Sequence, residues 1–327
     1  MKSNSVKRFA VLSLSCWLLA LSFNAVAEYP DRPIRLLVGF GAGSGTDVIA
    51  RTLATSMATA MKQPIVVDNR PGAMTGIASE AVARAPADGY TLLLANSTGM
   101  SMAPAGLMAQ TSYDPIRDFT PIGRIILVYS AMVSDAKFNI ISAQEMVEYL
   151  KANPDKANCA AGNAAGRVYC EAYRRMMGID MTTVPYKSST DAVAAVMGGQ
   201  APITFLDTIS LTPRIKQGQL HALAYFGPGR NAALPDVPAA SEVGLAELPL
   251  VVSWAALYAP ARLSIAVVAR LNAELNAALL RPEVRKVFLE GGMEIVPGTP
   301  EDLSTFHRND LEMWRKVIRE LNIQPEG

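Results

Sequence analysis

The segment at positions 34–51, IRLLVGFGAGSGTDVIAR, constrains the fold more than any other part of the chain. An apolar run ends at Phe40 in a loop that contains four glycines, and apolar residues then recur every four positions from Ile49 to Met61. Ser44 and Asp47 have the spacing of a helix-capping box. The segment therefore predicts a strand, a glycine loop, and a helix that begins near Ser44.

A helix that begins directly after a glycine loop is a candidate anion site. Its first backbone N–H groups lack partners inside the helix, and the helix dipole is positive at that end. The nucleotide motif G-x-G-x-x-G does not fit, because its third glycine would fall on Ser44, Thr46 or Val48. Asp68, placed where a ribose-binding acid could lie, does not compensate for this. A small carboxylate is the favoured anion, and a glycine turn without a ligand stays open.

The first 27 of the 327 residues have the pattern of a secretory signal. A basic start, Lys2 to Arg8, precedes a mainly apolar stretch, and small residues end at Ala27. Cys16 lies inside the apolar stretch and lacks a lipoprotein context. We therefore expect cleavage near Ala27 and a periplasmic protein, long enough after cleavage for two domains.

The charge of the remaining chain is nearly balanced. Without three basic residues of the signal, 27 basic and 29 acidic residues remain, a net charge of −2. No basic cluster interrupts this balance, so no nucleic-acid partner is expected.

Two cysteines, Cys159 and Cys170, remain after the signal. An oxidising compartment favours a disulfide between them, and two buried free thiols are the alternative. There is no C-x-x-C motif, so neither redox exchange nor a metal site is expected.

Strand-like and helix-like stretches alternate along the chain, which predicts an α/β fold with largely parallel sheets. The polar run Asn96–Thr98 follows a strand-like segment, at the edge where open α/β sheets bind ligands. An extended crossing at 122–134 separates two groups of such units. We predict two lobes around a cleft, one formed by 28–124 with 226–327 and the other by 125–225.

The chain resembles the substrate-binding receptors of tripartite tricarboxylate transporters, the Bug family of periplasmic solute-binding proteins. The resemblance covers positions 29 to 323 and rests on fragments in a fixed order: Tyr29-Pro30-Asp31-Arg32-Pro33-Ile34-Arg35, the loop up to Thr46-Asp47, Asp68-Asn69-Arg70-Pro71-Gly72, Ala87-Asp88-Gly89-Tyr90-Thr91-Leu92, Val184-Pro185-Tyr186-Lys187, Gly198-Gly199-Gln200, Pro235-Asp236-Val237-Pro238 and Arg281-Pro282-Glu283-Val284-Arg285.

The resemblance implies a two-lobed, flytrap-like fold, the type II periplasmic-binding-protein fold, in which two crossing strands join the lobes and a small carboxylic acid binds between them. The ligand-binding residues that it implies, together with our reading of the loops, are Phe40, Gly41, Ala42, Gly43, Ser44, Thr46, Asn96, Ser97, Thr98, Gly162, Asn163, Ala164, Arg167, Tyr186 and Asp207. The chain departs from the family at Gly39 and Gly41, where prolines are usual, at Val168-Tyr169, where His-Leu is usual, and at Ser188, where glycine is usual.

Several residues of these loops have a second possible role. Ser44 and Thr46 could donate hydroxyls to a carboxylate or only cap the helix. Asp47 would repel an anion, so we interpret it as a brace of the loop. Arg167 could clamp a second carboxylate or lie exposed on its helix. Lys187 and Asp207 could hold loop geometry.

The sequence favours a binding protein over an enzyme. His221 and His307 have no metal-ligand spacing, and no G-x-S-x-G nucleophile motif occurs. We expect a monomer without cofactor or metal that delivers its ligand to the membrane subunits of a transporter. A receptor that presents its ligand to a membrane sensor kinase is the alternative, and a secreted hydrolase is a third reading.

Overall fold

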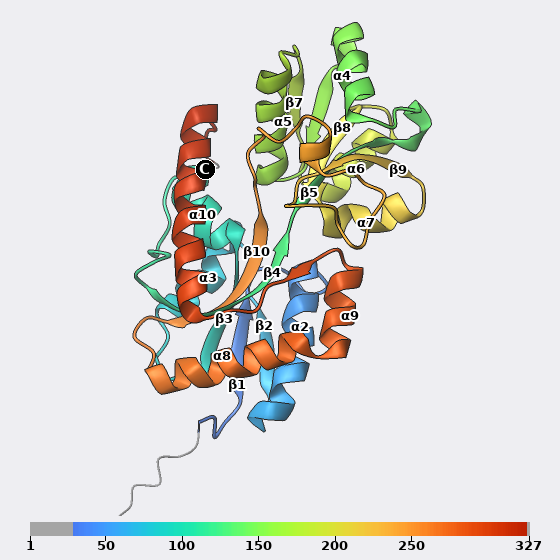
Figure 1. Cartoon of the computed structure of the whole chain (residues 1–327). Helices are drawn as coiled ribbons and strands as arrows, with labels where there is room; N and C mark the ends of the chain where they lie inside the picture. The colour runs from blue at the N-terminus through green and yellow to red at the C-terminus, as the bar shows by residue number, and fades with distance from the viewer. Residues whose placement is uncertain (1–28, 326–327) are drawn as a thin grey trace, which may run out of the picture.

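The computed structural model describes residues 29–325, and the predicted signal lies outside this range. The described chain forms two α/β lobes, one above the other in Figure 1, each built on its own sheet. We call the lobe with the six-stranded sheet the first lobe and the lobe with the five-stranded sheet the second lobe.

The sheet of the first lobe has the order β11-β4-β10-β3-β1-β2. Its strands are β1 (Ile34–Val38), β2 (Ile65–Asn69), β3 (Thr91–Asn96), β4 (Phe119–Val128), β10 (Ser253–Pro260) and β11 (Glu294–Ile295). Its helices are α2 (Gly45–Met61), η1 (Ala73–Thr75), α3 (Gly76–Ala83), the π-helix η2 (Thr98–Leu107), α8 (Ile265–Leu280), α9 (Pro282–Glu290) and α10 (Pro300–Leu321).

The sheet of the second lobe has the order β7-β6-β8-β5-β9. Its strands are β5 (Ser130–Asp135), β6 (Asn158–Ala161), β7 (Thr182–Pro185), β8 (Ile203–Asp207) and β9 (Leu220–Tyr225). Its helices are η3 (Ala136–Phe138), α4 (Ala143–Ala152), η4 (Pro154–Lys156), α5 (Ala164–Met177), α6 (Ser189–Met197) and α7 (Thr208–Lys216); η5 (Ala240–Glu242) follows β9 on the way to β10.

Both sheets are mixed, so the prediction of largely parallel sheets was wrong. In the first lobe β1 pairs in parallel with β2 and β3, but β10 runs antiparallel to β3 and β4. In the second lobe β5 runs antiparallel to β8 and β9. The reason is that β5 and β10, the first strand after each crossing between the lobes, enter their sheets from the opposite end. As a result, the start of β10 reaches the sheet edge where β3 ends.

The apolar pattern of each helix is buried against these sheets. One cluster joins β1, β3, β4 and β10 to α2, α8 and α9. A second cluster joins the second lobe to α10 and includes Trp314, which is fully buried. Arg175 of α5 also donates to the backbone oxygen of Glu320 in α10, at 2.9 Å. The residue boundaries proposed for the two lobes stay a prediction.

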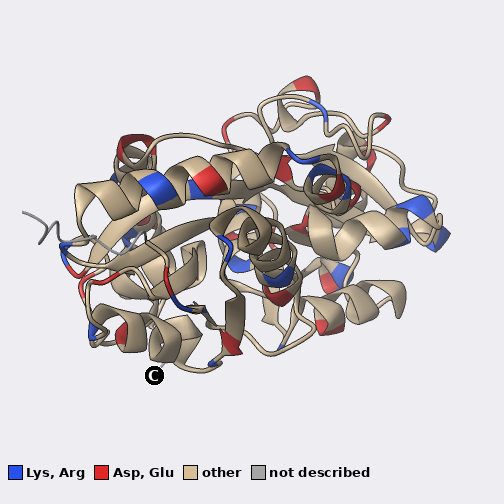
Figure 2. Ribbon diagram, turned by 90° about the horizontal axis from the view of Figure 1, so that it is seen from below, with Lys and Arg blue, Asp and Glu red and all other residues tan. Residues whose placement is uncertain are grey.

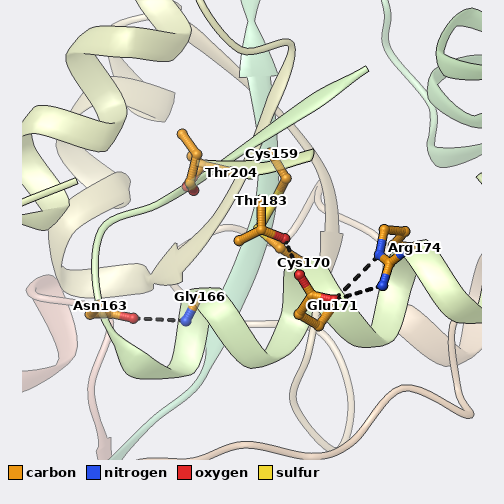
Figure 3. Close-up of a disulfide and its surroundings, with 9 residues drawn as sticks. Cys159, Asn163, Gly166, Cys170, Glu171, Arg174, Thr183 and Thr204 are labelled. Carbon is orange, nitrogen blue, oxygen red and sulfur yellow. Dashed lines mark hydrogen bonds and ion pairs between the residues drawn. A yellow bond between two sulfur atoms is a disulfide. The ribbon is translucent and has the colours of Figure 1, made fainter. Parts of the chain in front are cut away.

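A disulfide joins Cys159 in β6 to Cys170 in α5 (Figure 3), with their Cα atoms 5.9 Å apart. Of the two states left open by the sequence, the structure therefore has the bonded one. Both residues are fully buried. Nearby, Glu171 of α5 accepts from Thr183 of β7 at 2.6 Å and from Arg174 at 3.1 Å. The disulfide and the bond from Thr183 hold the middle of α5 against the sheet.

Acidic and basic positions are interspersed along the ribbon seen from below (Figure 2). Within residues 29–325, no helix is long and apolar enough to cross a membrane.

Candidate functional site

A cavity of about 470 Å³ lies between the two lobes. Its size falls in the range of small-molecule pockets. The lining residues are Phe40, Ser44, Gly45, Thr46, Ile49, Asn96, Ser97, Thr98, Ile126, Val128, Asn163, Ser188, Ser189, Thr190, Asp207, Ile209, Ser210, Ser253, Trp254 and Ala255. They come from the end of β4, from the start of β10, and from the segments that follow the carboxyl ends of β1, β3, β6, β7 and β8.

The cavity gathers about half of the residues that the sequence singled out. Lining it are Phe40, Ser44, Thr46, Asn96, Ser97, Thr98, Asn163 and Asp207. Outside its lining are Gly41, Ala42, Gly43, Gly162, Ala164, Arg167 and Tyr186. The first three of these are exposed at the outer part of the glycine loop.

Helix α2 begins at the cavity, and its N-terminus supplies free donors. Ser44 is the N-cap, and its Oγ accepts from the backbone N–H of Asp47 at 3.2 Å, which confirms the predicted start of the helix. Among the contacts of residues 29–325, the N–H groups of Gly45 and Thr46 have no acceptor. Because these two residues begin a helix of 17 residues, the positive end of a helix dipole reinforces the two donors.

Asp47 faces away from the cavity and braces the glycine loop. Its carboxylate accepts from the backbone N–H of Gly43, from Nε of Arg51 and from Nδ2 of Asn69, each at 2.9 Å. Asn69 also donates to the backbone oxygen of Phe40 at 3.0 Å. The bond from Arg51, followed by that from Gly43, lowers the pKa of Asp47 to about 2. The carboxylate is therefore ionised, and both of its oxygens are bound by residues that hold the loop.

The end of β3 continues the donor surface beside α2. Asn96 Oδ1 accepts from the backbone N–H of Gly99 at 3.1 Å, which leaves the NH₂ group of Asn96 available. Thr98 adds a half-buried hydroxyl, and Ser97 lies buried beneath it. Because β1 and β3 are parallel, their carboxyl ends bring these residues next to Ser44.

Three helix starts of the second lobe face the same cavity. Asn163 caps α5, Ser188 caps α6 and Asp207 caps α7. Asn163 also donates to Oγ of Ser189 at 3.3 Å, which ties the α5 and α6 starts together. The second lobe therefore presents mainly neutral hydroxyl and amide groups to the cleft.

The lobes touch on one side of the cavity. Thr208 of α7 donates its hydroxyl to the backbone oxygen of Gly292 at 3.0 Å. Ile209 packs against the apolar cluster of the first lobe, next to Gly45. We call these contacts between α7 and the first lobe the seam.

Gly162 has a packing role at the site. A Cβ built there would lie 2.7 Å from the backbone oxygen of Ser188 and 2.7 Å from Cα of Ser189. Glycine therefore allows the β6–α5 turn to approach the start of α6.

We predict that Gly162→Ala moves the start of α6, lowers carboxylate affinity about 10-fold and destabilises the fold by about 1–2 kcal/mol. Calorimetry and urea unfolding measure the two effects. Gly229→Ala is the control, since a Cβ at Gly229 meets nothing within 4 Å. If Gly162→Ala bound the carboxylate as tightly as the wild type and were equally stable, this packing role would be contradicted.

Arg167 and Tyr186 do not line the cavity. Arg167 is half-buried in the first turn of α5, and its side chain has no hydrogen-bond or ion-pair partner among residues 29–325. Tyr186 packs against the core of the second lobe, and its hydroxyl donates to Gln200 at 3.4 Å. Lys187 is exposed.

Sequence reasoning missed several lining residues. Ser188 and Asp191 have the same capping spacing that identified Ser44, so Ser188–Thr190 could have been found. Ile126, Val128 and the start of β10 carry no such local signal.

The residues that could suggest catalysis lie elsewhere. His307 is buried between the Tyr258 hydroxyl, 2.9 Å from Nδ1, and the backbone oxygen of Met100, 2.8 Å from Nε2. Burial lowers its pKa to about 4. Within residues 29–325, no group of three or more histidine, cysteine or acidic residues is placed to hold a metal ion.

The family model described as the tripartite tricarboxylate transporter family receptor matches residues 49–323. The chain belongs to this receptor family. BugT of Bordetella pertussis is 32% identical to this receptor over 295 residues, 89% of this chain and 90% of BugT.

Solved structures share the receptor fold. MatC (Rpa3494) from Rhodopseudomonas palustris, with bound malate, has a TM-score of 0.74 and 27% identity, covering 89% of this receptor and 100% of MatC. R. palustris Rpa4515, with adipate, has a TM-score of 0.80 and 26% identity, covering 91% of this receptor and 100% of Rpa4515. The two-lobed periplasmic-binding-protein fold is thereby confirmed.

Proposed function

We propose that this receptor captures a small organic carboxylate between its lobes in the periplasm and delivers it to the membrane subunits of a tripartite tricarboxylate-type transporter. The observation that carries the proposal is the pair of free N–H groups at the start of α2, Gly45 and Thr46, which open on the cavity. A carboxylate there accepts both, with hydroxyls of Ser44 and Thr46 beside it.

The relatives support this choice of ligand. MatC holds malate and Rpa4515 holds adipate, both of them carboxylates. Membership of a transporter receptor family supports delivery to membrane subunits, and relatives that are periplasmic support that location. The seam at Thr208 and Gly292 lets the lobes close on a bound ligand, as contacts from both lobes then stabilise the closed state.

The test is binding to the purified exported protein. We expect at least one acid among hexanoate, adipate, benzoate and malate to raise the melting temperature of the protein. Calorimetry should show that one molecule of this acid binds per chain, with Kd about micromolar. The acid should be recovered unchanged. The matching neutral amide, such as hexanamide for hexanoate, should bind at least about 100-fold more weakly, because the α2 donors then meet no charge.

Thr46→Val keeps the side-chain volume and removes a hydroxyl, and should weaken binding about 5- to 10-fold. Equal affinity for acid and amide would contradict the proposal, and conversion of the acid would favour a hydrolase.

A further inference from the structure

We propose that the ligand of this receptor carries a single carboxylate, an apolar body, and at its far end a methyl group or a hydrogen-bond donor in place of a second carboxylate. The inference rests on the proposed function, because it assumes that one carboxylate binds at the start of α2.

The charges around the cavity do not provide for a second anion. Among residues 29–325, no lysine or arginine lines the cavity, and Asp207 is its one ionisable lining side chain. In the proposed function, the first carboxylate accepts from the N–H groups at the start of α2, and Asn96 lies beside it. A second carboxylate directed towards the second lobe would find the uncharged N–H and hydroxyl groups at the start of the nine-residue helix α6. The same side of the cavity carries the negative charge of Asp207, which repels the carboxylate.

Asp207 has one oxygen to offer a ligand. Its Oδ1 accepts from the backbone N–H and from the hydroxyl of Ser210, both at 2.9 Å, as the cap of α7. Its Oδ2 has no hydrogen-bond partner among residues 29–325 and is not among their enclosed unpaired atoms. A half-buried carboxylate oxygen open to the cleft suits a hydroxyl, an ammonium or an N–H of the ligand.

Five apolar side chains of the lining form a wall of the cavity. Phe40, Ile49, Ile126, Val128 and Ile209 all belong to, or pack against, one hydrophobic cluster. The wall draws on both lobes, since Ile209 comes from α7. Trp254 also lines the cavity, but its indole is not part of this wall. Its Nε1 donates to Asp310 of α10 at 2.7 Å. Branched aliphatic side chains therefore meet the middle of the ligand, and burying an apolar body against them favours binding.

Two series of acids that differ only at the far end test the inference. The first is hexanoate, 6-hydroxyhexanoate, 6-aminohexanoate and adipate. The second is 4-methylbenzoate, 4-hydroxybenzoate, 4-(aminomethyl)benzoate and terephthalate. In the series that fits the cleft, we expect the diacid to bind about 10-fold or more weakly than the best monoacid by calorimetry.

Asp207→Asn separates charge from structure, because asparagine caps helices as well as aspartate does. We expect this variant to improve diacid binding about 10-fold and to weaken binding of the amino acid by a similar factor. Asp155→Asn, which removes a carboxylate of the second lobe outside the cavity lining, should change neither ratio.

The outcomes separate the two proposals. A diacid that binds tightest in both series would overturn the inference and leave carboxylate capture standing. If its affinity also fell in Arg167→Gln, the clamp considered for Arg167 would replace the inference. A preference for monoacids that Asp207→Asn does not change would overturn the role of Asp207. No binding by any acid of either series or of the first panel would overturn the proposed function itself.

Discussion

Asp47→Ala is expected to lower the free energy of unfolding by about 3 kcal/mol and ligand affinity by about 10- to 100-fold. The stability loss follows because Gly43, Arg51 and Asn69 lose the buried carboxylate that they share. The affinity loss follows because the loop before α2 must then be ordered by the ligand, at about 1–2 kcal/mol for each residue fixed. Urea unfolding and calorimetry with the best-binding acid measure the two changes.

Glu80→Ala is the matched control for Asp47→Ala. Glu80 pairs with Arg84 four residues on, as Asp47 pairs with Arg51, but both partners are more exposed to water. An exposed pair of this kind contributes about 0.5 kcal/mol or less, so stability and affinity should barely change. If the two variants behaved alike, Asp47 would be no more than a surface partner of Arg51.

Loss of the disulfide between Cys159 and Cys170 is expected to lower the free energy of unfolding by about 2–3 kcal/mol. The bond closes a loop across 11 positions, which restricts the unfolded chain. The double variant Cys159→Ala/Cys170→Ala and the reduced wild type should both show the loss in urea unfolding. Affinity should fall less than in Asp47→Ala, because the Asn163 cap still holds the start of α5.

Reductant gives the control for the disulfide. It should destabilise the wild type and leave the double variant unchanged. Because the two cysteines are bonded to each other, a thiol reagent should find no free thiol of this pair in the unreduced protein, folded or unfolded. Equal stability of reduced and oxidised wild type would contradict a stabilising role.

The parts of the site that were predictable from sequence are the local ones. Ser44 and Asp47 lie three residues apart, so the cap that starts α2 is visible in the chain itself. The bracing role of Asp47 was also predictable, because an acid beside an anion site would otherwise repel the ligand.

The unpredictable parts depend on contacts between distant segments. Ala255 lies beside Asn96 only because β10 runs antiparallel between β3 and β4. No local pattern encodes that pairing, so the cavity residues of β10 were missed, and of the apolar wall only Phe40 was predicted as a ligand-binding residue. Arg167 shows the converse: a basic residue next to a predicted site looked suitable, but it does not line the cavity.

The most direct test of carboxylate capture observes the two free N–H groups themselves. In protein labelled with ¹⁵N-glycine and ¹⁵N-threonine, Gly45→Ala and Thr46→Ser assign the two amide signals. On titration with the best-binding acid, the proton signals of Gly45 and Thr46 should move downfield by more than any other labelled amide, because each N–H gains a charged acceptor. One-to-one binding of the acid that leaves both signals in place would contradict a carboxylate site at the start of α2.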